Sequence, residues 1–478
     1  MQPPDKDPRV YDYIIMGCGI SALTAAKLLS EQHSVLILER YNEPGGNHKS
    51  YTIDGMEFDI GAICFNTNDE QFRHFPELLR ECVEKDVHVK KICTTGAIGS
   101  YPFDWTAEAS SLTFRQRISC AISLLMWRLR SQRNDSARSY AQSRIGDALY
   151  RRVGLDLYIK RLFGVDAGGI DYDFAMKRMQ WLSRETSLRH RLGRMIRSRL
   201  GGNPAPGRTV VRPPGGFGAY YQKAICRLRE NGVEFKFNEA AVKIETRPTC
   251  MEVETNVRMY SAKQIISTIP LDEASALCGL PETGLPTVTM LSLYVALRGT
   301  WVPDCSIFYN FHSDGNWKRI TVHSHFYPSA AGYDKHFTVE ITIPPGAALP
   351  DPSHAFSDLR THLLKMKLIE GDLTLIGSSV LCNAYPIPEK GFKMRRDAAV
   401  AQLRSKGILC LGRQGKFEYI PHSNIAARET VATLSQASLL PPAADAEQRP
   451  PAAAVDSLRT SAPALPAFVA PEQNVQLP

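Results

Sequence analysis

A short glycine-rich segment near the N-terminus constrains the fold of this chain more than any other feature. Residues 17–22 read Gly-Cys-Gly-Ile-Ser-Ala and follow the apolar run Tyr11–Met16. In such a strand–turn–helix unit, Gly17 allows the tight turn, Gly19 lets the backbone approach a pyrophosphate, and Ala22 lets the helix pack on the sheet. The helix N-terminus then offers N–H groups and partial positive charge to phosphates.

The next residues support the same interpretation. Helical spacing runs from Ser21 to Glu31, and the β-rich segment Ser34–Leu38 follows, so that strand, helix and strand alternate. Glu39 ends the second strand, twenty residues after Gly19, where an acid commonly holds the ribose hydroxyls of a dinucleotide. These features together predict a dinucleotide-binding Rossmann unit.

The pattern changes several times along the rest of the chain. Residues 110–200 have helical spacing, 203–218 read as a Pro- and Gly-rich loop, and 286–345 are β-rich. Further strands are expected at 233–237, 241–245, 251–255, 264–268 and 408–412, and helices at 219–231 and 423–434. From Pro441 the chain is rich in Ala and Pro, which predicts a disordered tail.

This order predicts an α/β fold in which a Rossmann-type domain is interleaved with a helical insertion and a mixed β-sheet substrate domain. The predicted segments are the first Rossmann part (1–105), a basic helical insertion (106–202), the second Rossmann part (203–270), the β-rich substrate domain (271–395), the third Rossmann part (396–440) and the tail (441–478).

The positive charge of the chain is concentrated in the predicted insertion. The net charge is +8, yet the stretch Arg115–Arg199 holds nineteen Lys and Arg against seven Asp and Glu, a surplus of twelve. This surplus fits either solvated helical faces or a basic wall for an anionic ligand or an acidic surface. Basic and aromatic residues do not alternate, so a small anionic substrate is expected and nucleic acid is not.

No segment predicts a membrane span. The best apolar run, Ile118–Trp127, is about half of the ~20 residues that a span needs, and arginines flank it. It is expected to be buried or to lie on a surface, peripheral membrane contact included. The N-terminus lacks a signal-peptide pattern, and the eleven cysteines form no Cys-x-x-Cys pair. These features predict a cytoplasmic protein with reduced thiols.

Further blocks resemble a known superfamily. Glu39-Arg40 is followed by Gly45-Gly46-Asn47, Phe58-Asp59-Ile60-Gly61, Pro213–Gly218, Val242 and Leu411-Gly412-Arg413. This order is similar to that of the flavin amine oxidase and phytoene desaturase superfamily. The resemblance implies that FAD is the cofactor and that the Rossmann parts bind it. It also implies that the Gly-Gly turn, Asp59 and Gly61 lie along the flavin, that the backbone of Val242 holds the adenine, and that Gly412 and Arg413 close over the flavin.

Finer matches resemble the UDP-galactopyranose mutases. They are Gly45–Asn47, Phe65–Asp69, Trp317–Ile320 with His323 and Phe326, Tyr385-Pro386, and Gly412-Arg413 with Phe417–Tyr419. In that family reduced FAD attacks a nucleotide-linked sugar without net redox turnover. The resemblance implies that the sugar diphosphate is held by Arg178, Arg319, Tyr385, Arg413 and Tyr419. Arginine forks match phosphate oxygens and stay charged, and tyrosine adds a neutral donor.

Three departures from the mutase pattern leave rival functions open. Ile63 and Asn66 stand where that family has histidines, and the segment Tyr158–Gly164 lacks the family tryptophan, for which Phe163 could substitute. An oxidoreductase of the desaturase, amine oxidase or protoporphyrinogen oxidase type, acting on an apolar substrate, is the first alternative. NAD(P)H or another reductant is a candidate electron source for the FAD. A flavin-binding protein without turnover is the second.

Two neighbouring histidines raise the question of a metal. His323 and His325 would point to one face of a strand, but no cysteine or carboxylate stands near them in the sequence. No metal is therefore expected.

Overall fold

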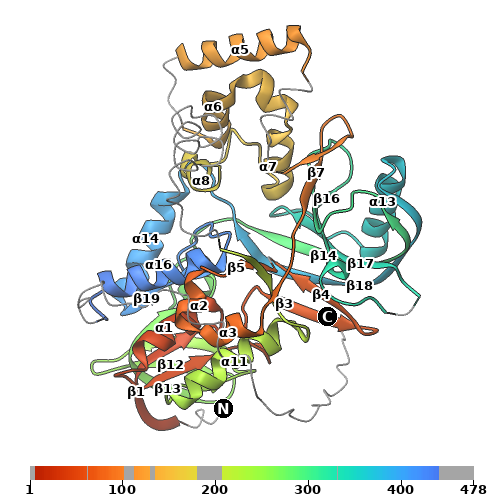
Figure 1. The fold of residues 1–478 in the computed structure, drawn as a ribbon. Coiled ribbons are helices and arrows are strands. Elements are labelled where there is room, and N and C mark those ends of the chain that lie inside the picture. Colours follow the sequence, from red (N-terminus) through yellow and green to blue (C-terminus); the bar gives the residue numbers. More distant parts are fainter. Residues whose placement is uncertain are drawn as a thin grey trace, which may run out of the picture.

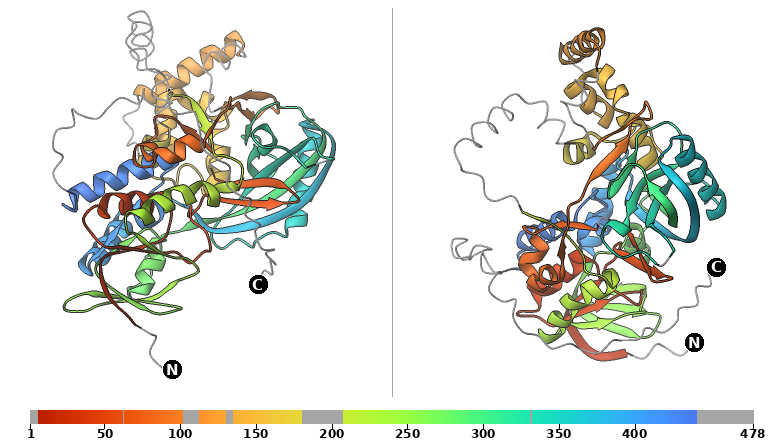
Figure 2. Two further views of the ribbon diagram at one scale, coloured as in Figure 1. Left: turned by 60° about the horizontal axis from the view of Figure 1, so that its bottom comes forward. Right: turned by 45° about the vertical axis from the view of Figure 1, so that its right-hand side comes forward.

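The computed structural model describes residues 6–61, 63–101, 112–129, 135–179, 207–330 and 332–440 (Figure 1). The predicted tail from Pro441 lies outside the described residues. Two seven-stranded sheets stand side by side, and a group of helices lies at the end of the molecule remote from the N-terminal sheet (Figures 1 and 2). The predicted α/β architecture with an interleaved Rossmann domain is confirmed.

The first sheet is built from three separated parts of the chain. Its order is β10-β2-β1-β13-β12-β11, and β19 also pairs with β13. The strands β10, β2, β1, β13 and β19 are parallel, whereas β12 and β11 are antiparallel to their neighbours. Their bounds are β1 Lys6–Met16, β2 Val35–Leu38, β10 Glu234–Lys236, β11 Ala241–Thr246, β12 Met251–Thr255, β13 Met259–Ser267 and β19 Ile408–Cys410.

Helices cover both faces of this sheet because successive strand residues point to opposite sides. Ile15 and Ile37 pack in the cluster that contains α1 and α11, whereas Ile14 and Leu36 pack in the cluster on the other face. The helices on the first face are α1 Ile20–Leu29, α2 Glu70–His74, α3 Pro76–Glu81, α11 Gly216–Glu230 and α16 Ser423–Gln436; those on the second are α12 Leu271–Leu277 and α14 Phe392–Ser405.

The second sheet is mostly antiparallel and has the order β18-β14-β17-β16-β15-β7-β8. Its strands are β7 Val89–Ile92, β8 Ile98–Ser100, β14 Thr287–Trp301, β15 Ile307–Asn310, β16 Trp317–Val322, β17 Lys335–Ile343 and β18 Ile369–Pro386, and helix α13 Pro352–Lys365 packs against it. Strands β7 and β8 belong to this sheet although they precede residue 105, the predicted end of the first Rossmann part. Strand β8 pairs with β7, and the pairing of β7 with β15 is long-range and leaves no local signal.

The helical insertion consists of α5 Phe114–Leu129, α6 Ala137–Arg152, α7 Leu155–Phe163 and α8 Tyr172–Arg178. The last three helices share a core that includes Tyr150 and Ile159 and reaches Met290 of the second sheet. Residues 180–206, part of the predicted insertion and loop, lie outside the described residues.

Two small sheets connect these parts. Strands β3 Lys49–Ile53 and β4 Met56–Ile60 form a hairpin, and β5 Cys64–Asn66, β9 Thr209–Val211 and β6 Val83–Glu84 form the other sheet. Strand β9 lies inside the predicted loop 203–218, because pairing with β5 and β6 satisfies its backbone. Helix α15 Gly412–Gly415 follows β19 directly.

The histidine pair differs from the prediction. Residues 323–325 form the 3₁₀ helix η1 and not a strand, so the two rings make separate contacts. His323 is buried, and its Nε2 pairs with Oγ1 of Thr338 at 2.8 Å, whereas Nδ1 of His325 lies 3.3 Å from Oγ of Ser306.

Candidate active site

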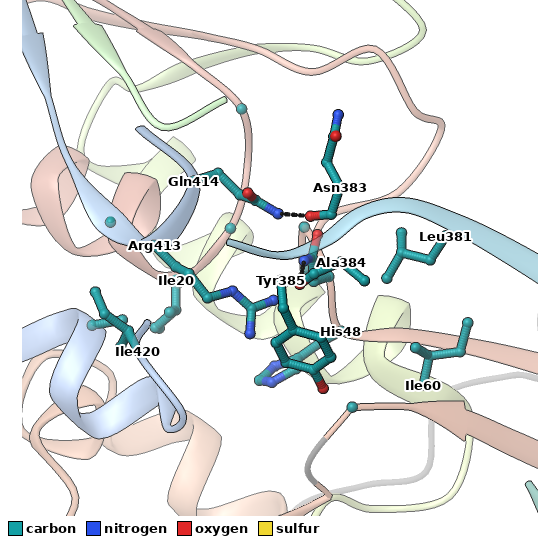
Figure 3. Close-up of a pocket in the computed structure, with 18 of the residues that line it drawn as sticks. Ile20, His48, Ile60, Leu381, Asn383, Ala384, Tyr385, Arg413, Gln414 and Ile420 are labelled. Atoms are coloured by element: carbon teal, nitrogen blue, oxygen red, sulfur yellow. Dashed lines mark hydrogen bonds between the residues drawn. The ribbon is translucent and has the colours of Figure 1, made fainter. Parts of the chain in front are cut away.

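One cavity lies between the carboxyl ends of the first sheet's parallel strands and the second sheet. Its wall combines the glycine fingerprint, the Gly-Gly turn, the segment after β10, residues of β16 and the end of β18. Figure 3 shows part of this wall, where Tyr385 and Arg413 lie beside each other near His48. Ligands of open α/β sheets bind at this edge, outside the carboxyl ends of the strands.

The fingerprint forms the turn that the sequence predicts. Gly17 has a φ of +91°, and a Cβ there would lie 2.6 Å from Oγ1 of Thr268, so a larger residue would meet both strain and a clash. Gly19 is the N-cap of α1 and supplies no side-chain hydrogen bond to the first turn. The N–H groups of the first turn of α1 are therefore placed to donate hydrogen bonds to phosphate oxygens.

The Gly-Gly turn lies against the fingerprint. Gly46 has a φ of +60°, and a Cβ there would come within 3.3 Å of Cα of Gly19. Gly45 joins the same turn by donating its N–H to the carbonyl of Cys18 at 2.9 Å. On the other side, Gly412 at the start of α15 lies against Ser21. The predicted glycines thus come together from three distant parts of the chain.

Glu39 follows β2 and lines the cavity, as a ribose-binding acid would, and it also stabilises the surrounding turn. Its carboxylate lines the cavity and accepts hydrogen bonds from the backbone N–H of Cys18 at 2.7 Å and of Tyr41 at 3.0 Å. Burial raises the pKa of Glu39, and these two amides oppose the rise. Each carboxylate oxygen keeps a second lone pair for a hydroxyl. Arg40 also lines the cavity and pairs with Glu273 at 3.1 Å.

Three predicted site residues do not lie on the described wall of the cavity. Ala22 is buried under the sheet, as helix packing requires, and Val242 is about half exposed on β11, while the neighbouring Ala240 and Ala241 line the cavity. Asp59 is fully buried in an ion pair with Arg212, 2.8 Å between oxygen and nitrogen. Arg178 ends α8, and its side chain lies outside the described residues.

Asp59 is absent from the cavity wall because it faces a buried arginine on the other side of β4. On β4, Asp59 points away from the cavity, and its neighbours Ile60 and Gly61 line it. Arg212 has no exposed side-chain surface and binds both Asp59 oxygens through Nε and Nη2. A buried carboxylate without a cation would destabilise the protein, so Asp59 has a structural role in this ion pair.

A cationic wall faces the glycine-rich side. Arg319 and Lys318 both pair with Glu340, and the Lys318–Glu340 distance is 2.8 Å. Burial opposes the charged carboxylate, but the two cations prevail and lower the pKa of Glu340 to about 2. Arg319 also donates to the carbonyl of Gly61 at 2.9 Å, which ties this wall to the predicted flavin-side segment.

Tyr385 lies between two cations. Nζ of Lys318 is 4.7 Å and Cζ of Arg413 is 5.1 Å from the centre of its ring, both in cation–π range. The ring of Tyr419 is 6.1 Å from that of Tyr385, centre to centre. Arg319, Tyr385, Arg413 and Tyr419, all predicted to hold the diphosphate, thus line one cavity. Among the described residues, no carboxylate forms an ion pair with Arg413.

His48 is a wall residue that the sequence analysis missed. Its Nδ1 is 2.7 Å from the hydroxyl of Tyr221, its ring stacks on Phe217 at 4.7 Å, and Gly61 lies close beside it. Burial, and then the charge of Arg413, lower the pKa of His48 to about 4, so the ring is neutral at pH 7. Ile63, at the family's histidine position, also lines the cavity. A histidine thus lies beside Gly61, but it is His48 and not residue 63, where the mutase pattern has its histidine.

Asn66 and Phe163, the other two differences from the mutase pattern, lie outside the cavity wall. Asn66 does not line the cavity; it donates to the carbonyl of Gly207 at 3.0 Å. Phe163 does not serve as a stacking platform, because its ring packs against Phe174 at 5.0 Å, whereas Tyr158 and Leu162 of the same helix line the cavity.

The residues present fit an FAD-type dinucleotide. Glycine backbone and a helix N-terminus suit the pyrophosphate, a carboxylate at the end of β2 suits a ribose, and Ala240 and Ala241 leave room at the far end of the cavity. Fold and site have the form of a dinucleotide-binding α/β protein, and one wall of the same cavity is cationic.

Comparisons with known proteins agree with this class. Residues 15–82 match the NAD(P)-binding Rossmann-like domain family. A reduced UDP-galactopyranose mutase superposes with a TM-score of 0.69 at 17% identity, covering 90% of this chain and 96% of the other. A protein from Exiguobacterium sp. 255-15 assigned as a protoporphyrinogen oxidase gives 0.66 at 16%, covering 91% and 99%. A putrescine oxidase gives 0.55 at 15%, covering 91% and 99%.

The chain therefore shares the overall fold of these solved structures, including the predicted Rossmann-type domain. Among curated proteins, prolycopene isomerase of Arabidopsis thaliana is 40% identical over 68 residues. That match covers 14% of this chain and only 11% of the isomerase, about a tenth of its length.

Proposed function

We propose that this protein is an FAD-dependent enzyme. Gly17, Gly19, Gly46 and Glu39 would hold the pyrophosphate and ribose, and Ala240 and Ala241 would flank the adenine. When bound, FAD would supply a nucleophile in its reduced form or an electron acceptor in its oxidised form. The chain would position the substrate beside it and keep water out.

We propose further that the substrate carries a diphosphate, as a nucleotide-linked sugar does. Arg413 carries this proposal: its guanidinium lies in the cavity without a carboxylate partner among the described residues. Lys318, Arg319 and Arg413 bring three positive charges and Glu340 one negative charge, so two positive charges remain. Two ionised phosphates would neutralise them.

Each residue would then have a separate task. Arg413 would bind phosphate oxygens through its planar fork, and the hydroxyls of Tyr385 and Tyr419 would donate to the same group. Arg319 is held by Glu340 and Gly61, so it would act mainly as a fixed charge. The neutral His48 can present one ring nitrogen to the ligand while the other pairs with Tyr221.

The test is an assay of flavin-dependent isomerisation. Purified protein with bound FAD, confirmed by its visible spectrum, is incubated with UDP-galactofuranose with and without dithionite, and UDP-galactopyranose is measured by chromatography. Conversion only in the reduced sample supports a mutase reaction. In Arg413→Ala, Kd for UDP should rise at least about tenfold, whereas Arg404→Ala, an exposed arginine on α14, should leave it unchanged. An unchanged Kd in Arg413→Ala contradicts the diphosphate proposal.

A second candidate is an oxidoreductase with an apolar substrate. It is favoured by the wall residues Ile60, Ile63, Met290, Ile307 and Leu381, which surround the cationic group with apolar surface. Bleaching of oxidised flavin by an apolar compound under anaerobic conditions, together with no mutase activity, would support it over the first candidate.

A further inference from the structure

Helix α5 exposes a continuous apolar stripe. Its 16 residues include none that is buried, and six large apolar side chains are exposed along one face. Their spacing of four, four, three, one and three residues matches successive helical turns. The exposed fraction is 77% for Phe114 and 76% for Leu129; the full stripe is Phe114, Ile118, Ile122, Leu125, Met126 and Leu129.

The orientation of this stripe is fixed by the opposite face of the helix. Cys120, Ser123, Leu124 and Trp127 are partly buried against α6. Oγ of Ser123 accepts a hydrogen bond from the N–H of Ala148 at 3.1 Å. A Cβ on Gly146 would lie 2.7 Å from the backbone nitrogen of Leu124, so the two helices touch backbone to backbone.

The stripe lies at the outer end of the molecule. Figure 1 shows α5 above α6 at the end remote from the first sheet, and the right-hand view of Figure 2 shows it there again. Helices α6 and α7 lie between α5 and the cavity, to whose wall α7 contributes Tyr158 and Leu162.

The charges of α5 indicate what covers the stripe. The helix contains Arg115, Arg117 and Arg128 and no acidic residue. Apolar residues flanked by arginines suit the boundary between acyl chains and anionic headgroups. At about 1.5 Å per residue, α5 is roughly 24 Å long, shorter than the ~30 Å bilayer core. Among the described residues, no helix is long and apolar enough to cross a membrane.

We propose that α5 lies in the plane of an anionic lipid bilayer, with its apolar stripe among the acyl chains and its arginines at the phosphates. A second copy of the chain fits less well. An antiparallel pair of α5 helices would bring Arg115 and Arg117 of one copy toward Arg128 of the other, without a carboxylate on either helix. The membrane contact does not depend on the enzymatic proposal.

The experiment is vesicle sedimentation of the full chain. Vesicles of phosphatidylcholine with 30% phosphatidylglycerol, as a chosen probe, are compared with phosphatidylcholine alone. The wild type should bind the anionic vesicles, and 0.5 M salt should weaken this binding. Ile122→Glu/Leu125→Glu should lower the partition coefficient at least about tenfold, because both carboxylates would enter the apolar layer. These positions are exposed, so the variant should fold like the wild type.

Two controls distinguish the alternatives. Met394→Glu places a carboxylate on α14, at a side chain 78% exposed, and should leave vesicle binding unchanged. Sedimentation velocity of wild type and Ile122→Glu/Leu125→Glu checks for self-association. Absence of binding to the anionic vesicles, unchanged binding of the double variant, or a dimer that only the wild type forms would each overturn the proposal.

Discussion

The guanidinium of Arg413 lies over the ring of Tyr385, with Cζ 5.1 Å from the ring centre, and Lys318 lies over the same ring. The ring therefore holds two like charges in place near each other. Tyr385→Ala should weaken UDP binding at least about tenfold, because both cations lose their support. Tyr385→Phe keeps the ring and should lose less. Titration calorimetry with UDP measures both, and equal losses would show that only the hydroxyl matters.

Glu340 balances two buried cations, so its charge should matter for stability. In Glu340→Gln, Lys318 and Arg319 remain buried without their counter-charge, and the free energy of unfolding at pH 7 should fall by about 3–5 kcal/mol. The folded-state pKa of Glu340, about 2, is below its ordinary 4.5, so its contribution is present above pH 4.5 and is lost as pH falls toward 2. Urea unfolding should show the two proteins converging over that window; a constant difference would contradict this assignment.

His48 should make the fold sensitive to mild acid. Its pKa falls from 6.5 to about 4 on folding, so the unfolded chain takes up its proton first and stability decreases as pH falls from 6.5 to 4. His48→Gln should reduce the slope of unfolding free energy against pH by up to about 1.4 kcal/mol per pH unit. Urea denaturation at several pH values measures this slope. His354→Gln, at an exposed position of α13, is the control for replacing a histidine by glutamine.

Gly17 should be required for the cofactor. Gly17→Ala places a methyl group 2.6 Å from Thr268 Oγ1 at a φ of +91°, which displaces the turn, and the purified protein should contain much less FAD. Gly232→Ala is a matched control, because its φ is +83° and its Cβ would meet nothing within 4 Å. The ratio of flavin to protein absorbance measures the content. Full occupancy in Gly17→Ala would contradict the role of this turn.

The elements of the Rossmann-type domain are predicted well, because short local sequence patterns determine them. Strand β12 coincides with its expected bounds, and α16 and α11 begin within three residues of theirs. The glycine fingerprint depends on backbone conformations that few residue types allow, so its residues identify its geometry.

The features that the sequence did not predict depend on contacts between segments far apart in the chain. Nothing near Asp59 indicates that Arg212 will enclose it, and nothing near His48 places it beside Gly61. Strand β7 is short, and its partner β15 lies more than two hundred residues later in the chain. Such pairings are set by the assembled core and leave no periodic signal in the sequence.

The division of the first sheet among three chain segments affects the order of events during synthesis. Strand β19 and helix α15, which bring Gly412 and Arg413 to the cavity, lie between residues 408 and 415, after all the other strands of both sheets. When only the first Rossmann segment has been synthesised, the glycine turn at residues 17–22 exists, but the cavity still lacks Gly412 and Arg413. If the chain binds FAD as proposed, the cofactor can be enclosed only after residues 408–415 have been synthesised, so cofactor loading would follow the synthesis of both sheets.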